Sequence, residues 1–339
     1  MGLDRNSRVC IVGAGAIGNW LGAALARQGC AVAALARGAT LAALRARGIE
    51  LQSADPAAPG TWVSRFVPVR ASDDPAELGV QDLVIVAVKG PAMAGVAARI
   101  GPLLGPDTVV LTAMNGLPWW FLQGFGGAVA DRRLLAIDPD GAIAAGIPAP
   151  SVVGCVVHAS CINAGPGVTR HVQGRGLIIG EPGGVPRARS RALADLLAAA
   201  GFELSLSDCI QKDIWYKLWG NMTVNPLSAI TGATTDLLLA DDLVRGFMSA
   251  VMIEARDIGA RIGIPIAENP DDRHAVTRKL GRFKSSMLQD VEAGRAIELD
   301  ALVTAVRELG GMVGVATPFT DALLGVSRLF ARQRGLYPD

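Results

Sequence analysis

Three glycines near the start of the chain have a spacing that can bind phosphate. Gly13, Gly15 and Gly18 follow the apolar run 9–12 as G-x-G-x-x-G. Glycines at this spacing allow a tight turn, close approach of the backbone to a pyrophosphate, and close packing of helix on strand. The N–H groups and dipole of the following helix favour the phosphate. The residues predicted to contact a dinucleotide are Gly13, Gly15, Ala16, Ile17 and Gly18. The alternative is a glycine-rich turn that binds nothing.

The end of the second apolar run indicates which dinucleotide would bind. A site for NAD usually has Asp or Glu about 20 residues after the glycines, where it binds the ribose 2′-hydroxyl. Here residues 34–38 read Ala-Leu-Ala-Arg-Gly and contain no acid. A guanidinium can hold a phosphate with two parallel hydrogen bonds, so Arg37 favours NADP(H) with its 2′-phosphate. The alternative is a solvated cation at the end of a strand.

Lys217 and two amides form a second group of residues that could carry out chemistry. Lys217 and Asn221 are four residues apart, which places them on one face of a helix. Asn225 stays near that face if the helix continues. Pro226 disfavours continuation, so Asn225 could instead cap a new helix. A positioned ammonium can protonate a developing oxyanion. The alternative is a surface lysine whose stem packs on apolar neighbours.

One carboxylate, Glu298, lies in a segment that also contains a helix boundary. Gly294 is expected to end one helix, and the next helix is expected to begin near Ile297. Glu298 would then lie in a first turn, where the helix dipole alone favours an acidic side chain. The residue types therefore leave open whether Glu298 is functional or only stabilises the helix.

Strands that alternate with helices are predicted to position these groups in the first half of the chain. The predicted strands are 9–12, 31–36, 49–52, 62–67, 82–88 and 109–114, and the helices are 20–26, 41–47 and 92–100. This alternation predicts a doubly wound α/β sheet, whose ligands bind outside the carboxyl ends of the strands. Gly13, Arg37, Lys89 and Asn115 all follow such ends, which predicts that they share a site.

The second half of the chain changes to long helical patterns. Further strands are predicted over 152–162, 168–172 and 177–179, followed by a helix over 186–200. After residue 208 strand patterns are few, which places a boundary between about 186 and 208. We therefore expect an α/β domain of Rossmann type over 1–190 that binds NADP(H). An all-α domain over 191–339 is expected to bind the substrate and carry the catalytic groups.

Composition excludes several classes of protein. The 339 residues are 50% hydrophobic and 19% charged, which predicts a large core and argues against disorder. The net charge of +1 and the lack of a basic block argue against nucleic acid as the main partner. Five cysteines without a C-x-x-C pair and three scattered histidines predict no metal site. Without a signal peptide or membrane-span pattern, we expect a cytoplasmic protein with reduced thiols and no membrane contact.

Together these segments resemble the ketopantoate reductase (2-dehydropantoate 2-reductase) family over most of the chain. The shared motifs are GAGAIG at 13–18, AVKG at 87–90, MNGL at 114–117, GRGLIIGE at 174–181, K-x-x-x-N-x-x-x-N-P at 217–226, and SSMLQD at 285–290 with E-x-D at 298–300. The last two motifs are the most specific. The resemblance implies an N-terminal Rossmann domain, an all-helical domain and an active site in the cleft.

The resemblance also implies a role for each residue. Lys217 would be the general acid that protonates the keto oxygen, and Glu298 would bind the substrate hydroxyl and orient Lys217. The remaining implied contacts are Asn221, Asn225 and Ser286 with substrate, Asn115 with both nicotinamide and substrate, Lys89 near cofactor and carboxylate, and Arg37 with the 2′-phosphate. The implied activity is an NADP-dependent oxidoreductase that reduces ketopantoate to pantoate, in pantothenate biosynthesis.

One segment departs from the family pattern and leaves the substrate open. After Asn115 and Gly116 the family usually has a small turn, whereas residues 117–121 read Leu-Pro-Trp-Trp-Phe. The aromatic side chains could reshape the substrate pocket, pack on the domain surface, or form the contact of a homodimer. Another branched or aromatic 2-oxo acid is therefore a second hypothesis for the substrate. A non-catalytic NADP(H)-binding sensor is the hypothesis from another class of protein.

Overall fold

The computed structural model describes residues 2–58 and 60–338, so the outer ends of the two expected domains, residues 1 and 339, lie outside the described residues. The chain forms two compact units, which we describe separately. Unit 1 contains Met1–Met114 and Ala142–Ile210, and unit 2 contains Asn115–Gly141 and Gln211–Asp339.

This division differs from the expected boundary between residues 190 and 191. That boundary falls inside helix α6 (Ala188–Ala199), which contacts strands β9 (Val168–Gly180) and β10 (Glu203–Leu206) of unit 1. Because β10 pairs with β9 in the sheet, unit 1 continues to Ile210. The segment 115–141 also belongs to unit 2, although unit 1 precedes and follows it in sequence.

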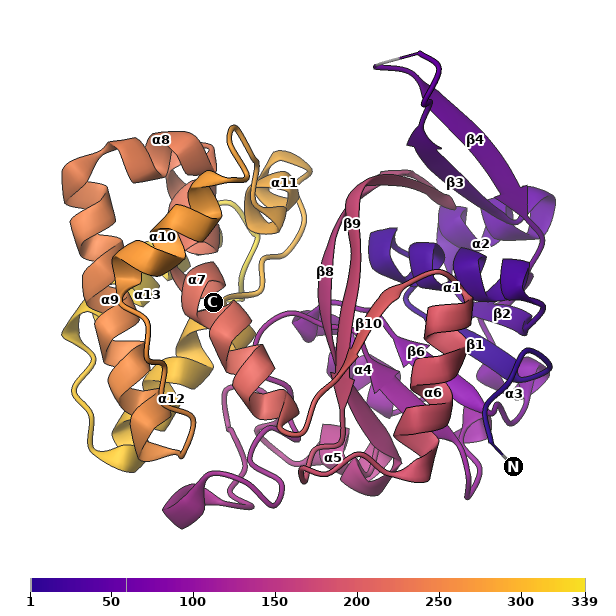
Figure 1. Ribbon diagram of the computed structural model, residues 1–339, viewed down its shortest axis with the longest axis horizontal. Coiled ribbons are helices and arrows are strands. Elements are labelled where there is room, and N and C mark those ends of the chain that lie inside the picture. Colours follow the sequence, from indigo (N-terminus) through magenta and orange to yellow (C-terminus); the bar gives the residue numbers. More distant parts are fainter. Residues whose placement is uncertain (1, 59, 339) are drawn as a thin grey trace. The chain divides into compact units, whose positions relative to one another are not determined.

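Within the described residues, the strands of unit 1 form one ten-stranded sheet (Figure 1). The other strands are β1 (Arg8–Val12), β2 (Ala31–Leu35), β3 (Ile49–Ala54), β4 (Trp62–Val67), β5 (Arg70–Ser72), β6 (Leu83–Val86), β7 (Val109–Thr112) and β8 (Val152–Gly165). The order is β4-β3-β9-β8-β7-β6-β1-β2-β5, with β10 beside β9. Neighbours from β5 to β8 are parallel, whereas β8–β9 and β3–β4 are antiparallel. The sheet is therefore mixed, with a Rossmann-type parallel half.

The helices of unit 1 lie against this sheet. They are α1 (Ala16–Gln28), α2 (Gly38–Arg47), α3 (Pro75–Leu78), α4 (Met93–Ala97), α5 (Ala142–Gly146) and α6, with 3₁₀ turns η1 (Gly90–Ala92), η2 (Gly101–Leu103) and η4 (Ala149–Ser151). Helix α1 contacts β1, β2, β3, β8 and β9. Because strands surround it, every residue from Gly18 to Leu25 is buried. This explains an apolar pattern too continuous for a surface helix.

Three predicted elements of unit 1, a helix and two strands, differ from those observed. The predicted helix 92–100 is broken into η1, α4 and η2, because glycine and proline begin both 3₁₀ turns. The predicted strands 168–172 and 177–179 are one strand, β9, which pairs with β8 along most of its length. Irregular pairing between His158 and Cys161 accommodates the polar, glycine-containing stretch that interrupts the pattern of β9.

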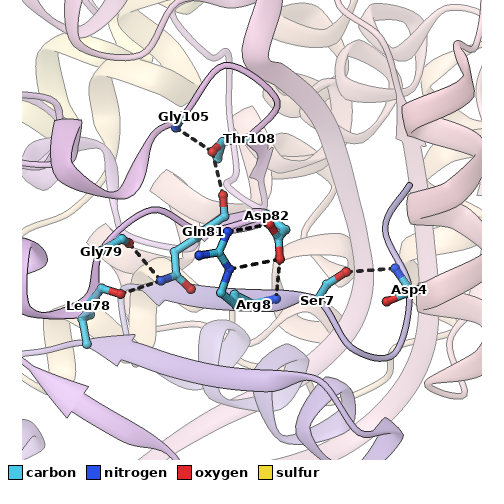
Figure 2. Close-up of polar contacts among 9 residues, drawn as sticks. All are labelled: Asp4, Ser7, Arg8, Leu78, Gly79, Gln81, Asp82, Gly105 and Thr108. Carbon is cyan, nitrogen blue, oxygen red and sulfur yellow. Dashed lines mark hydrogen bonds and ion pairs between the residues drawn. The ribbon is translucent and has the colours of Figure 1, made fainter. Parts of the chain in front are cut away.

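The amino-terminal ends of β1, β6 and β7 are joined by a polar network (Figure 2). The Arg8 backbone N–H and its Nη2 donate to opposite carboxylate oxygens of Asp82, over 2.8 and 2.9 Å. Gln81 Nε2 donates to the carbonyls of Leu78 and Gly79, each over 2.9 Å, and its own carbonyl accepts from the Thr108 hydroxyl. These polar groups therefore satisfy one another at this edge of the sheet.

Unit 2 is built from helices. They are α7 (Ile210–Thr231), α8 (Thr235–Ala240), α9 (Asp242–Arg261), α10 (Pro270–Arg278), α11 (Ser286–Glu292), α12 (Ala305–Val313) and α13 (Pro318–Arg332), with the 3₁₀ turn η3 (Gly127–Val129) and the π-helical turn η5 (Asp300–Thr304). Helix α7 continues through Pro226, so Asn225 does not cap a new helix. Its residues from Met222 to Ala229 are all buried. We infer that packing offsets the hydrogen bond lost at the proline.

Side-chain contacts hold the helices of unit 2 together. The Trp219 indole N–H on α7 donates to the Met252 carbonyl on α9, over 2.7 Å. The Glu254 carboxylate on α9 accepts from the backbone N–H groups of Phe319 and Thr320, each over 2.8 Å. Since those N–H groups begin α13, Glu254 neutralises the positive end of that helix from a neighbouring one.

Neither a membrane-spanning helix nor a metal site has a candidate in the part of the chain that the structure describes. No helix there is long and apolar enough to cross a membrane. No group of three or more His, Cys, Asp or Glu side chains there could hold a metal ion.

Candidate active site

The glycine loop after β1 has the geometry that its spacing predicts. Gly13 has a φ of +102°, which L side chains rarely adopt, and a Cβ added there would lie 2.7 Å from Val88 Cγ1. A Cβ on Gly18 would lie 2.1 Å from the Gly13 carbonyl oxygen. By contrast, a Cβ on Gly15 would have no neighbour within 4 Å. The first and third glycines are thus required by the protein itself, and the second faces open space.

This loop suits the pyrophosphate of a dinucleotide. Helix α1 begins directly after Gly15, and Ala16 and Ile17 lie partly exposed in its first turn. No side chain caps this helix end, so its first N–H groups can bind an anion. From β9, the fully buried Thr169 hydroxyl donates to the Gly15 carbonyl over 3.4 Å, a contact that the sequence analysis missed.

Two predicted cofactor contacts follow neighbouring strands of the same sheet. Arg37 lies two residues after β2 and Lys89 three residues after β6, and both strands are parallel to β1 between them. Gly13, Arg37 and Lys89 therefore follow the carboxyl edge of the sheet, as predicted. Arg37 is exposed and immediately precedes α2. The pattern of each segment predicts the strand end, and the order of the strands brings the two ends to either side of β1.

Within unit 2, Lys217 and Asn115 are hydrogen-bonded although they are 102 residues apart in sequence. Lys217 Nζ on α7 donates to Asn115 Oδ1 over 2.9 Å. Asn115 begins unit 2, three residues after the end of β7. Lys217 is partly buried and is flanked on its helix by buried Trp215, Leu218 and Trp219. This contact orients the ammonium group, because it reduces the rotamer freedom of a flexible side chain.

The predicted substrate contacts differ in their surroundings. Asn221 and Asn225 follow Lys217 along the continuous helix α7, within about a quarter-turn of each other by helical geometry. Asn221 is partly exposed and Asn225 is 5% exposed. Ser286 is exposed at the start of α11, where the neighbouring Ser285 hydroxyl accepts from the Leu288 N–H. The two amides therefore lie near the face of α7 that carries Lys217, whereas Ser286 lies on a separate short helix.

Arg273 on α10 adds positive charge beside α7, where it lies close to Tyr216 and Gly220. Its guanidinium carbon lies 5.7 Å from the centre of the Tyr216 ring, and its Nη1 donates to Thr277 Oγ1 over 3.2 Å. Burial lowers the pKa of Arg273, although an arginine in a protein remains charged. The sequence analysis did not predict a role for Arg273, because no residue spacing within one segment relates a position on α10 to a position on α7.

Glu298 occupies a position different from the one predicted. The predicted helix from Ile297 would place Glu298 in its first turn, but the helix begins at Leu299 and Glu298 precedes it. The Ile297 N–H donates to the Leu336 carbonyl over 3.0 Å, so this stretch is paired with the end of the chain instead. Glu298 therefore lies immediately before the first turn rather than within it, and the structure leaves dipole compensation open as its role.

The turn after Glu298 contacts the segment that carries Asn115. The Leu117 N–H donates to the Ala301 carbonyl in η5 over 2.8 Å. A Cβ on Gly116 would lie 2.5 Å from that carbonyl oxygen, so a glycine is required between Asn115 and Leu117. Segments that begin at residues 115 and 298 are thereby joined within unit 2, and Asn115 is bonded to Lys217.

The aromatic run at 119–121 is part of the core of unit 2. Trp119, Trp120 and Phe121 are 5%, 1% and 0% exposed, respectively. The Phe121 ring lies 6.0 Å from that of Trp215 on α7. The expectation of a dimer contact is therefore wrong for these side chains, because they are buried within unit 2, where Phe121 packs against the helix that carries Lys217.

Comparison with known proteins gives one family for both units. The family described as "Ketopantoate reductase PanE/ApbA" matches residues 9–184, and its C-terminal part matches residues 209–331. A 2-dehydropantoate 2-reductase of Mesorhizobium japonicum is 41% identical over 97% of this chain and 99% of its own length. The crystal structure of a candidate ketopantoate reductase from Ralstonia solanacearum MolK2 is 53% identical, with a TM-score of 0.91 over 98% of this chain and 100% of that one.

A more distant structure shares the fold alone. A D-mandelate dehydrogenase, in a ternary complex with NADH and anilino(oxo)acetate, is 21% identical with a TM-score of 0.82, covering 97% of this chain and 99% of that one.

From the family matches over both units and the 41% identity along the whole chain, we conclude that this protein belongs to the ketopantoate reductase family of dinucleotide-binding oxidoreductases.

Proposed function

We propose that this protein uses NADPH to reduce 2-dehydropantoate, a branched 2-oxo acid with a hydroxyl group, to pantoate. The observation that carries the proposal is the Lys217–Asn115 hydrogen bond, which orients an ammonium group on the helix that also presents Asn221 and Asn225. The charge of Arg273 beside that helix supports an anionic substrate. The identity of 41% to a 2-dehydropantoate 2-reductase supports this particular 2-oxo acid.

The proposed reaction assigns one task to each residue. NADPH, when bound, supplies the hydride that is added to C2 of the 2-oxo acid. Lys217 donates a proton to the former keto oxygen, which would otherwise become an alkoxide, and regains a proton from solvent. Asn115 orients the ammonium of Lys217. Asn221, Asn225 and Ser286 hold the substrate, and the Glu298 carboxylate accepts a hydrogen bond from its hydroxyl.

NADP(H) rather than NAD(H) is proposed for unit 1. The glycine loop accommodates a pyrophosphate, and exposed Arg37 at the carboxyl edge of the sheet can pair with a 2′-phosphate. No acidic residue follows β2 to bind a ribose 2′-hydroxyl, since the chain reads Ala36-Arg37-Gly38. Lys89, on the neighbouring strand end, is proposed to lie near the cofactor.

The proposal is tested by NADPH oxidation with three 2-oxo acids: 2-dehydropantoate, 2-oxoisovalerate, which lacks the hydroxyl, and the aromatic phenylpyruvate. We expect kcat/KM for 2-dehydropantoate to exceed that for 2-oxoisovalerate by at least about tenfold. A hydrogen bond to a charged group contributes roughly 1.5–3 kcal/mol, and its loss leaves Glu298 unsatisfied. Glu298→Ala should narrow the gap between these two substrates.

Other outcomes would assign a different function. Preference for phenylpyruvate would favour an aromatic 2-oxo acid, although the burial of residues 119–121 removes the sequence feature that suggested it. Equal rates with 2-dehydropantoate and 2-oxoisovalerate would refute the substrate and retain the reductase. Cofactor binding without turnover of any 2-oxo acid would point to a non-catalytic sensor.

A further inference from the structure

The end of the chain contacts residues on both sides of Glu298. Before it, the Ile297 N–H donates to the Leu336 carbonyl over 3.0 Å. After it, the Asp300 Oδ1 accepts from the Tyr337 hydroxyl over 2.5 Å. We call residues 336–338 the C-terminal tail. No motif pointed to this tail, and none of the roles above uses it.

The C-terminal tail is itself fixed to α13. The Leu336 N–H donates to the Ala331 carbonyl over 2.9 Å, and the Leu336 side chain is 5% exposed. Arg332 Nε donates to the Pro338 carbonyl over 2.8 Å, and its guanidinium lies 5.9 Å from the centre of the Tyr337 ring. The tail is therefore an ordered support, because its own contacts are made to a long helix.

Asp300 transmits this support to the turn that follows Glu298. Its Oδ1 also accepts from the Thr304 hydroxyl, over 3.1 Å, and its backbone carbonyl accepts from the Ala305 N–H. Burial, followed by the neighbouring Asp300 carboxylate, raises the pKa of Tyr337 to about 12. The phenol therefore stays protonated, and remains a hydrogen-bond donor, at the near-neutral pH of an enzyme assay.

The same turn is linked to Lys217 indirectly, through the segment that carries Asn115. Ala301, the next residue after Asp300, accepts the Leu117 N–H over 2.8 Å. Leu117 lies two residues after Asn115, whose Oδ1 accepts from Lys217 Nζ. Glu298 thus precedes a π-helical turn that is held by the tail and also by the segment bonded to the proposed general acid. Such turns are frequent at functional sites because they break the regular helical spacing.

We propose that Tyr337 is a positioning residue, which acts through Asp300 to hold the Glu298 carboxylate where it selects a hydroxylated substrate. This proposal rests on the proposed function of Glu298. A displacement of about 1 Å in a contact group can cost a large factor in rate, so a bond two residues away can affect specificity. Neither Tyr337 nor Asp300 touches the substrate in this proposal.

The test is a double-mutant cycle between Tyr337→Phe and Glu298→Gln. The measured quantity is the ratio of kcat/KM for 2-dehydropantoate to that for 2-oxoisovalerate. We expect Tyr337→Phe to lower this ratio by about fivefold or more, mainly through a higher KM for 2-dehydropantoate, with the KM for NADPH unchanged. In the Glu298→Gln background, Tyr337→Phe should lower the ratio no further.

Ser249→Ala is the matched control for a purely structural loss. It removes the hydroxyl of Ser249, which donates to the Arg245 carbonyl and is hydrogen-bonded to His274 Nε2 within unit 2, and neither contact involves the tail. It should leave the substrate ratio unchanged. If the Tyr337→Phe ratio equals that of wild type, or if the two losses multiply in the double variant, the positioning role is wrong while the reductase function stands.

Hydrogen exchange tests the tail without any turnover. The Ile297 amide should exchange at least about fivefold faster in Tyr337→Phe than in wild type, with amides of α9 unchanged. Equal exchange at Ile297 overturns the proposal whatever substrate is reduced. Faster exchange in a protein that reduces no 2-oxo acid would support the tail's contact and refute only the proposed function.

Discussion

The two units present their functional groups in different ways. In unit 1 the predicted cofactor site is built from backbone and strand ends: Gly13, Gly15 and Gly18 lie within six residues, directly after β1. In unit 2 the proposed chemistry uses side chains from Asn115, Lys217 and Glu298, which tertiary contacts bring to one region. A binding loop can therefore be local in sequence, whereas the groups that carry out chemistry here are not.

Unit 1 shows a second contrast between the two ends of the same strands. At the amino-terminal ends, Arg8 is paired with Asp82, and Gln81 is bonded to Thr108 (Figure 2). At the carboxyl ends, Gly15 faces open space and Arg37 is exposed. The difference follows from parallel strands: α1 and α2 begin after the carboxyl ends of β1 and β2, and no side chain caps either helix.

The largest effect is expected in unit 2, at Lys217. Lys217→Ala should lower kcat by about 10²–10⁴ because the proton donor is lost, with NADPH affinity nearly unchanged. Steady-state kinetics and cofactor titration measure the two quantities. Lys212→Ala, an exposed lysine on the same helix, is the control and should retain wild-type kcat. A folded Lys217→Ala enzyme with near-normal kcat would mean that another group supplies the proton.

Two glycine variants separate folding from binding in unit 1. Gly18→Ala should lower the free energy of unfolding by about 1–3 kcal/mol without cofactor, because its Cβ would meet the Gly13 carbonyl at 2.1 Å. Gly15→Ala should leave that stability nearly unchanged yet weaken NADPH binding by about tenfold, since the added methyl occupies space proposed for the pyrophosphate.

Denaturation without cofactor and NADPH titration measure both effects. Gly95→Ala, also without a neighbour within 4 Å, is the control for an added methyl group and should change neither quantity appreciably. Normal NADPH affinity in Gly15→Ala would mean that the dinucleotide does not bind at this loop. The contrast between a local binding loop in unit 1 and distant side chains in unit 2 would then no longer hold.

A smaller effect is expected at Arg37. Arg37→Ala should weaken NADPH binding by about tenfold, because a charge-assisted hydrogen bond to the 2′-phosphate is lost, and should leave NADH binding nearly unchanged. Binding titrations with both dinucleotides measure this difference. Arg27→Ala, an exposed arginine in the last turn of α1, should alter neither affinity. Equal losses for both dinucleotides would exclude Arg37 from the phosphate site.

The smallest effect concerns the pH dependence of stability in unit 2. Burial lowers the pKa of His274 below its unfolded value of about 6.5; the nearby Asp271 opposes this shift, and Arg278, Arg245 and Arg273 add to it. As pH falls through about 7, the unfolded chain gains a proton before the folded protein does. The free energy of unfolding should therefore decrease until pH reaches the folded pKa.

His274→Asn should flatten this part of the stability curve, measured by denaturant unfolding at several pH values. Cys10 and Cys161 of unit 1 should not contribute there, because burial raises the pKa of both thiols to about 12. An unchanged slope in His274→Asn would assign the pH dependence to another group.

Most elements of unit 1 could be predicted from the sequence, for physical reasons that are local. The strand 83–86 is a continuous apolar run because it is buried on both faces, and β4 has the bounds that its alternation predicts. The boundary after Ile210 could not be predicted, because it depends on the pairing of β10 with β9. The continuation of α7 through Pro226 was also open, because local propensity and burial oppose each other there.

The sequence by itself determined the family, the glycine turn after β1 and the helix that carries Lys217, because each is encoded in residues close together in the chain. Only the tertiary structure decided that Trp119, Trp120 and Phe121 are core, that Lys217 is bonded to Asn115, and that Tyr337 supports the turn after Glu298. These contacts join residues separated by tens to hundreds of positions. No local pattern encodes them, because each pairing depends on how the helices of unit 2 pack.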